Sequence, residues 1–132
     1  MVLAFSNGIS ASLKVKPAVK RDLFRDVIYP SKSRLVGELR VFSALLYLLL
    51  APHLEQLELI TIDTEYPGHD ADIRGMFLNH VRAGGQSIDK KAVDFGRIGK
   101  HSSAHKLAYA VYKCKVRETL LVRIRDVERL LR

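Results

Sequence analysis

The fold is decided by residues 57–66, LELITIDTEY, in which an apolar, β-branched run ends just before Pro67-Gly68. This pattern predicts a short buried strand that stops at Asp63, because the Pro-Gly pair forces a turn. In sheets that are flanked by helices, ligands bind outside the carboxyl ends of the strands. We therefore expect the Asp63 carboxylate to face a crevice rather than the core.

Two antiparallel strands are predicted before this stretch. Residues 1–6 are apolar, Asn7-Gly8 is a strong hairpin signal, and residues 9–16 alternate apolar and polar side chains. Residues 23–29 are interpreted as a third strand that closes a meander, with a short helix from Val19 as the alternative. The sequence thus favours an antiparallel beginning for the sheet.

A long buried helix is predicted to follow. Ser31 or Ser33 is expected to cap it, and Pro52 to end it. Glu38 lies on a helix face with apolar neighbours, where an unpaired carboxylate would be costly. Its structural explanation is a partner such as Arg34, four residues earlier.

The second half of the chain predicts a helix over 69–82, a strand over 92–98 and a helix that Ser102 or Ser103 caps. Tyr109 and Tyr112 in this last helix are interpreted as packing residues rather than as a base-stacking surface. The tail from Val116 fits either a helix or a strand followed by a helix with an Asp126 cap.

Composition narrows the class of protein. The 132 residues predict one domain over 1–132, and a formal net charge of +8 points to a polyanion such as nucleic acid. A single cysteine, Cys114, excludes an intramolecular disulfide and favours a reducing, cytoplasmic compartment. The apolar run over 41–54 is too short for the ~20 residues of a membrane helix, so no membrane partner is expected. The oligomeric state stays open.

Four local motifs occur in the same order as in one known family. Residues 5–8, FSNG, are similar to a first strand that reaches Asp-Gly, and residues 31–39, SKSRLVGEL, look like a capped helix whose acid precedes Leu. Residues 62–66, IDTEY, resemble a strand that ends in Thr-Asp-Ser-X-Tyr. Residues 99–101 and 104–108, GKH and AHKLA, resemble a Lys-Gly-His loop and a helix with Asp-X-Leu-Ala. Together they resemble the ribonuclease H-like superfamily, closest to type-one ribonuclease H.

This resemblance implies an α/β fold with a mixed five-stranded sheet flanked by helices. It also implies an endonuclease that hydrolyses the RNA strand of RNA/DNA hybrids with two Mg²⁺ or Mn²⁺ ions. The catalytic and metal-binding positions would be Asn7, Glu38, Asp63 and His105. Substrate-binding positions would be Gly8, Ser31, Ser33, Arg34, Arg97, Lys100 and His101.

Two positions depart from the family pattern. His105 stands where the family has Asp, and an imidazole still binds metal, with a preference for Mn²⁺ over Mg²⁺. Asn7 stands where the family has an acid that bridges both ions, and a neutral amide cannot supply that charge. The sequence leaves open whether Asn7 is natural or engineered. The alternatives are a nuclease that resolves four-way DNA junctions and a basic nucleic-acid-binding module without catalysis.

Overall fold

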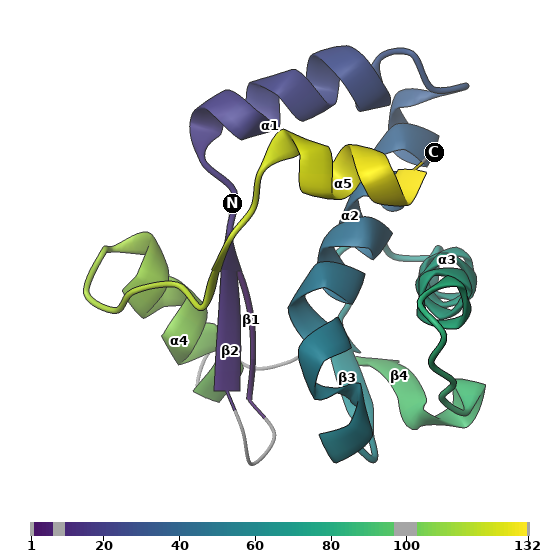
Figure 1. Cartoon of the computed structure of the whole chain (residues 1–132), viewed down its shortest axis with the longest axis vertical. Coiled ribbons are helices and arrows are strands. Elements are labelled where there is room, and N and C mark those ends of the chain that lie inside the picture. The colour runs from purple at the N-terminus through teal and green to yellow at the C-terminus, as the bar shows by residue number, and fades with distance from the viewer. Residues whose placement is uncertain (1, 7–9, 97–102, 132) are drawn as a thin grey trace.

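The computed structural model describes residues 2–6, 10–96 and 103–131, which form a mixed α/β fold with two small sheets (Figure 1). The strands are β1 (Val2–Ser6), β2 (Ser10–Lys14), β3 (Ile60–Asp63), β4 (Val93–Gly96) and β5 (Leu120–Leu121). The α-helices are α1 (Pro17–Leu23), α2 (Arg34–Leu50), α3 (Asp70–Ala83), α4 (Ser103–Tyr112) and α5 (Ile124–Leu131). Three shorter helical segments are η1 (Phe24–Ile28), η2 (Ala51–Gln56) and η3 (Lys90–Ala92).

The first sheet contains the predicted hairpin. Strands β1 and β2 are antiparallel, with Leu3 opposite Leu13, and the alternate residues Ala11, Leu13 and Val15 are buried. Strand β5 lies parallel to β2, and there the backbone N–H of Ser12 donates to the hydroxyl of Thr119 at 3.1 Å. The N–H of Thr119 donates in return to the Ser12 hydroxyl at 3.2 Å. The two predicted strands are confirmed, whereas their turn lies outside the described residues.

The second sheet contains the strand predicted within residues 57–66. Strands β3 and β4 are parallel, with Ile60 opposite Val93 and Asp63 opposite Gly96. Ile60 and Ile62 are buried, while the side chains that alternate with them are exposed. Parallel neighbours need a crossover connection, which α3 supplies. The predicted helix over 69–82 is confirmed with shifts of one residue at its ends. The last predicted strand is confirmed over Val93–Gly96, and its residues 97 and 98 lie outside the described part of the chain.

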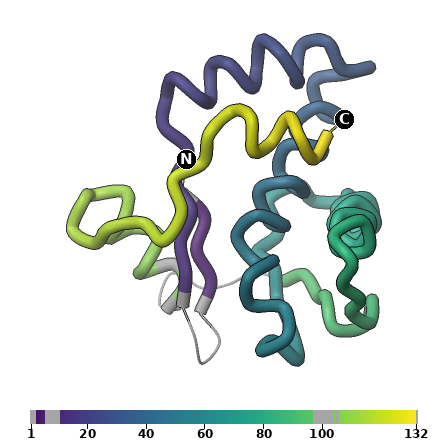
Figure 2. Tube along the Cα trace, in the orientation of Figure 1, coloured from purple at the N-terminus to yellow at the C-terminus, as the bar shows by residue number. Residues whose placement is uncertain are grey.

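Helix α2 lies between the hairpin and α3, and η1 and α5 cross its first turns (Figure 2). The Ser33 hydroxyl accepts the Val36 N–H at 3.1 Å, which confirms the predicted cap. From Val41 to Leu46 every residue is buried, because the helix is apolar nearly all round. One hydrophobic cluster includes α2 and residues of both sheets.

Helix α2 and η2 together make a long apolar stretch. The 23 residues of Arg34–Gln56 have the length and composition of a membrane span, and 56% of their most apolar window is buried inside the protein. The buried core helix of a soluble protein has the same character, so this stretch is weak evidence for a membrane.

The predicted third strand is wrong. Residues 23–29 are helical, since α1 begins at Pro17 and continues as the π-helical segment η1. Pro17 has no N–H to lose at the first helical position, and its fixed φ favours a helix start. Leu23, Val27 and Ile28 recur at helical spacing and are all buried. The alternative of a short helix in this region is the one that the structure has.

The described strands do not form the single five-stranded sheet that the resemblance implies. They form a three-stranded sheet in the order β1-β2-β5 and a separate pair, β3-β4. A helix that is apolar nearly all round needs cover from several directions. The hairpin, α3, η1 and α5 pack on α2 and supply that cover.

The tail has the strand-and-helix arrangement. Leu120–Leu121 is the short strand β5, and the Val122 N–H donates to the Lys14 carbonyl at 2.9 Å. The Arg123 N–H then donates to the Asp126 carboxylate at 3.0 Å, which satisfies a donor at the start of α5.

Helix α2 approaches η1 closely at Gly37. A Cβ atom at this position would lie 2.7 Å from Ile28 Cα and 2.9 Å from the Ile28 carbonyl oxygen. Both atoms belong to backbone, so neither can rotate away. Gly37 therefore sets the distance between η1 and α2.

We expect Gly37→Ala to destabilise the protein by about 1–3 kcal/mol, because the new methyl group overpacks a backbone contact. Urea unfolding gives the free energy of unfolding. Gly75→Ala is the matched control, since it lies in α3 with nothing within 4 Å of its Cβ position. The control should stabilise by about 0.5–1 kcal/mol through helix propensity. Equal stability of Gly37→Ala and the parent would contradict the close contact.

Candidate functional site

Asp63 lies at the carboxyl end of β3, as predicted, and its side chain is exposed. The pairing with β4 continues for one more residue, because the Thr64 N–H donates to the Gly96 carbonyl at 3.1 Å. The chain then turns through Gly68, whose φ of +85° suits glycine, before α3 begins. The strand end thus presents a carboxylate to solvent beside a tight turn.

Glu38 lies in the second turn of α2, and its side chain is 23% exposed. Arg34 Nε donates to Glu38 Oε1 at 3.0 Å, in an ion pair between consecutive turns. Arg34 is therefore the structural partner that the sequence predicts for Glu38. The hydrogen bond to Glu38, and then its charge, raise the pKa of Arg34. The Arg34 guanidinium also lies over the Phe24 ring, 5.5 Å from its centroid.

Tyr66, in the segment after Asp63, packs on α2, the helix that carries Glu38. Its ring meets the Phe42 ring of α2 edge to face, with 5.5 Å between centroids. Burial raises the pKa of the Tyr66 hydroxyl, and the charges of Glu38 and Glu65 raise it further. Tyr66, which follows Asp63 by three positions, therefore packs on the same helix that carries Glu38. Helix α2 and the segment after β3 therefore lie next to each other.

The other two predicted metal ligands have side chains outside the described part of the structure. Asn7 lies outside the described residues, and His105 lies in α4, where its side chain is also outside the description. Helix α4 packs on β1 and β2, whereas Asp63 belongs to the other sheet. Among the side chains that the structure describes, no three of His, Cys, Asp and Glu gather as a metal site. Two of the four predicted ligands, Glu38 and Asp63, are described.

The predicted substrate-binding residues divide in two groups. Ser31, Ser33 and Arg34 lie at the start of α2, and each already has a partner: the Ser31 hydroxyl donates to the Val27 carbonyl at 2.6 Å. The others fall outside the described residues: Gly8, Arg97, Lys100 and His101. Within the described group, Arg34 is the residue that bonds to Glu38.

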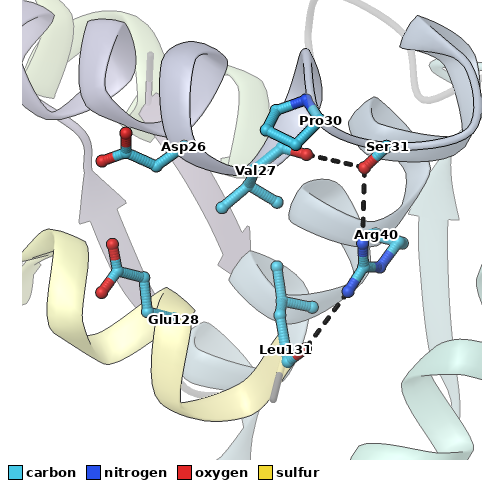
Figure 3. A pocket seen from close by; sticks show the side chains of 7 residues that line it. All are labelled: Asp26, Val27, Pro30, Ser31, Arg40, Glu128 and Leu131. Carbon is cyan, nitrogen blue, oxygen red and sulfur yellow. Dashed lines mark hydrogen bonds between the residues drawn. The ribbon is translucent and has the colours of Figure 1, made fainter.

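Sequence reasoning missed Arg40, which joins α2 to α5 and to the turn after η1 beside a pocket of about 280 Å³ (Figure 3). One guanidinium nitrogen donates to the Ser31 hydroxyl at 3.3 Å, and another donates to the Leu131 carbonyl at 3.1 Å. The carboxylates of Asp26 and Glu128 line the other side of the pocket. A sequence pattern does not reveal this arrangement, because Leu131 is 91 positions away.

The interpretation of Tyr109 and Tyr112 as packing residues is wrong. The side chains are 54% and 65% exposed. The inner side of α4 is instead formed by residues such as Val111, which is 1% exposed. The helical spacing contains the signal, since Leu107, Ala108 and Val111 share one face and the two tyrosines lie off it.

No protein-family model matches the sequence, and neither a curated protein nor a solved structure matches the chain.

We expect Arg40→Met to destabilise the protein by about 1–3 kcal/mol, because two hydrogen bonds to a charged group are lost and the Leu131 carbonyl loses its donor. Amide hydrogen exchange should show the loss first in α5. Arg25→Met is the control, since the Arg25 side chain is 70% exposed and pairs only with Asp22 and Asp26 among the described residues. A control variant as unstable as Arg40→Met would contradict the special role of Arg40.

Proposed function

We propose that the protein is a metal-dependent endonuclease of the ribonuclease H type, with the RNA strand of RNA/DNA hybrids as its substrate. The observation that carries the proposal is the packing of α2, the helix that bears Glu38, against the segment after Asp63, where the Phe42 and Tyr66 ring centroids are 5.5 Å apart. Two carboxylates on neighbouring segments can share a divalent cation. The net charge of +8 supports a polyanionic substrate.

The chemistry of the donor set fits one divalent ion better than two. Glu38 and Asp63 bring two negative charges, whereas Asn7 and His105 bring neutral donor atoms. Two Mg²⁺ or Mn²⁺ ions bring four positive charges, so their mutual repulsion would be poorly offset. When bound, the cation would supply Lewis-acid stabilisation of the scissile phosphate. An acid at position 7 would strengthen the case for a second ion.

The Arg34–Glu38 ion pair is compatible with this role. Arg34 is 69% exposed, and water and salt screen such a pair, so it contributes little to stability. Glu38 can therefore exchange Arg34 for a cation at small cost. The released guanidinium would then be available to bind a phosphate in two-pronged geometry.

The second candidate is a basic nucleic-acid-binding module without catalysis. The same ion pair favours it, because Arg34 already gives Glu38 a structural reason to be acidic. Asn7 favours it as well, since an amide brings no charge to a metal site.

The deciding experiment is cleavage by the parent chain and by Asn7→Asp, with Mg²⁺ or Mn²⁺. Substrates are an RNA/DNA hybrid, duplex DNA and a four-way junction. We expect Asn7→Asp to cut the hybrid, and both Glu38→Gln and Asp63→Asn in that background to lower the rate by about 100-fold or more. Glu58→Gln is the matched control, because Glu58 is exposed and precedes β3.

Each result separates the candidates. If Asn7→Asp binds the hybrid but cuts none of the substrates, the non-catalytic module is correct. Cleavage of the junction alone would replace the hybrid by a DNA junction as substrate. Undiminished cutting by Glu38→Gln would exclude the proposed site.

A further inference from the structure

The outer surface of α4 combines aromatic rings with positive charge. Tyr109 and Tyr112 are three positions apart and more than half exposed, and Lys113 follows them directly. We call these three residues the tyrosine patch. Helix α4 packs its other side on the hairpin, at the edge of the molecule farthest from α3 (Figure 1). The patch therefore faces solvent rather than a neighbouring element.

The Lys113 ammonium lies close to both rings. Its Nζ is 5.7 Å from the centroid of Tyr109 and 5.7 Å from that of Tyr112, within the range of cation–π contact. The Lys113 N–H donates to the Tyr109 carbonyl at 2.9 Å, so the lysine continues the helix. Two rings and one cation thus occupy the last turn of α4 together.

The chain after α4 adds more positive charge beside the patch. Cys114 takes a left-handed conformation, with φ of +58°, and the Lys115 N–H donates back to the Ala110 carbonyl at 2.9 Å. This closure ends the helix and turns the chain back, which keeps Lys115 and Arg117 near the last turn. Both side chains are exposed.

The segment 103–118 is strongly positive. It contains Lys106, Lys113, Lys115 and Arg117 against a single acid, Glu118. None of the four forms an ion pair with any residue that the structure describes. Unpaired cations around flat rings complement a ligand that alternates phosphates with planar bases.

We propose that the tyrosine patch binds single-stranded nucleic acid, with bases stacked on Tyr109 and Tyr112 and the phosphate backbone held by the surrounding lysines. A duplex hides the faces of its bases, so only an unpaired strand offers them to the rings. An acidic protein surface would pair with the positive charges but would offer no planar bases to stack on the tyrosine rings. This site uses neither Glu38 nor Asp63, so it does not depend on the proposed hydrolysis.

The test is fluorescence anisotropy of a labelled twelve-nucleotide oligo(dT), titrated with the full chain in EDTA so that no cleavage occurs. We expect Tyr109→Ala and Tyr112→Ala each to weaken binding about tenfold, because each removes one stacking surface. Tyr109→Phe and Tyr112→Phe keep the ring and should stay within about twofold of the parent. Circular dichroism of each variant verifies that the fold is intact.

Tyr29→Ala is the matched control. Tyr29 is 68% exposed, but it follows η1 at the other end of the molecule, so its loss should leave the oligo(dT) affinity unchanged. The proposal is overturned if the Tyr109 and Tyr112 alanine variants bind like the parent. It is also overturned if a blunt duplex, or heparin, competes as well as unlabelled oligo(dT). If Asn7→Asp with Mg²⁺ or Mn²⁺ cuts none of the substrates while oligo(dT) binding still depends on the two tyrosines, the proposed hydrolysis is refuted and this site stands.

Discussion

Helix α2 is apolar nearly all round, and the need to cover it shapes the rest of the structure. Each fully buried Leu on it contributes about 1.5–3 kcal/mol of transfer free energy, and a single sheet could cover only one side. The hairpin covers one side, α3 covers another, and η1 and α5 cross the first turns. Even the one hydroxyl in its buried middle, Ser43, is satisfied by the Leu39 carbonyl at 2.8 Å. The division of the strands between two sheets follows from this arrangement.

Local signals were sufficient where neighbouring residues decide the structure. The Ser33 cap, the alternating hairpin and the strand that ends at Asp63 depend on a few adjacent positions, and all were predictable. Residues 23–29 were not, because their short apolar run suits a strand as well as a helix. The helical segment places the Ile28 backbone against Gly37 of α2, and this contact is not visible in the sequence.

The candidate site also combines features that neighbouring residues decide with features that depend on packing. The Arg34–Glu38 pair joins positions i and i+4 of a helix, so the sequence predicted it. The contact between Phe42 and Tyr66 depends on how α2 packs against the segment after β3, and no spacing rule anticipates that. The exposure of Tyr109 and Tyr112 was predictable, since Leu107, Ala108 and Val111 share one face of α4 and the two tyrosines lie off it. The error was to assign large rings to the core by residue type rather than by position on the helix.

The reciprocal hydrogen bonds between Ser12 and Thr119 join residues 107 positions apart. Nearly the whole described chain must therefore be synthesised before β5 can pair with β2. Until then the hairpin keeps an unpaired edge, and the loop to be closed is among the longest that this chain can form. Sheet completion should thus be a late, slow step of folding. The nascent chain would depend meanwhile on α2 and its nearer neighbours for structure.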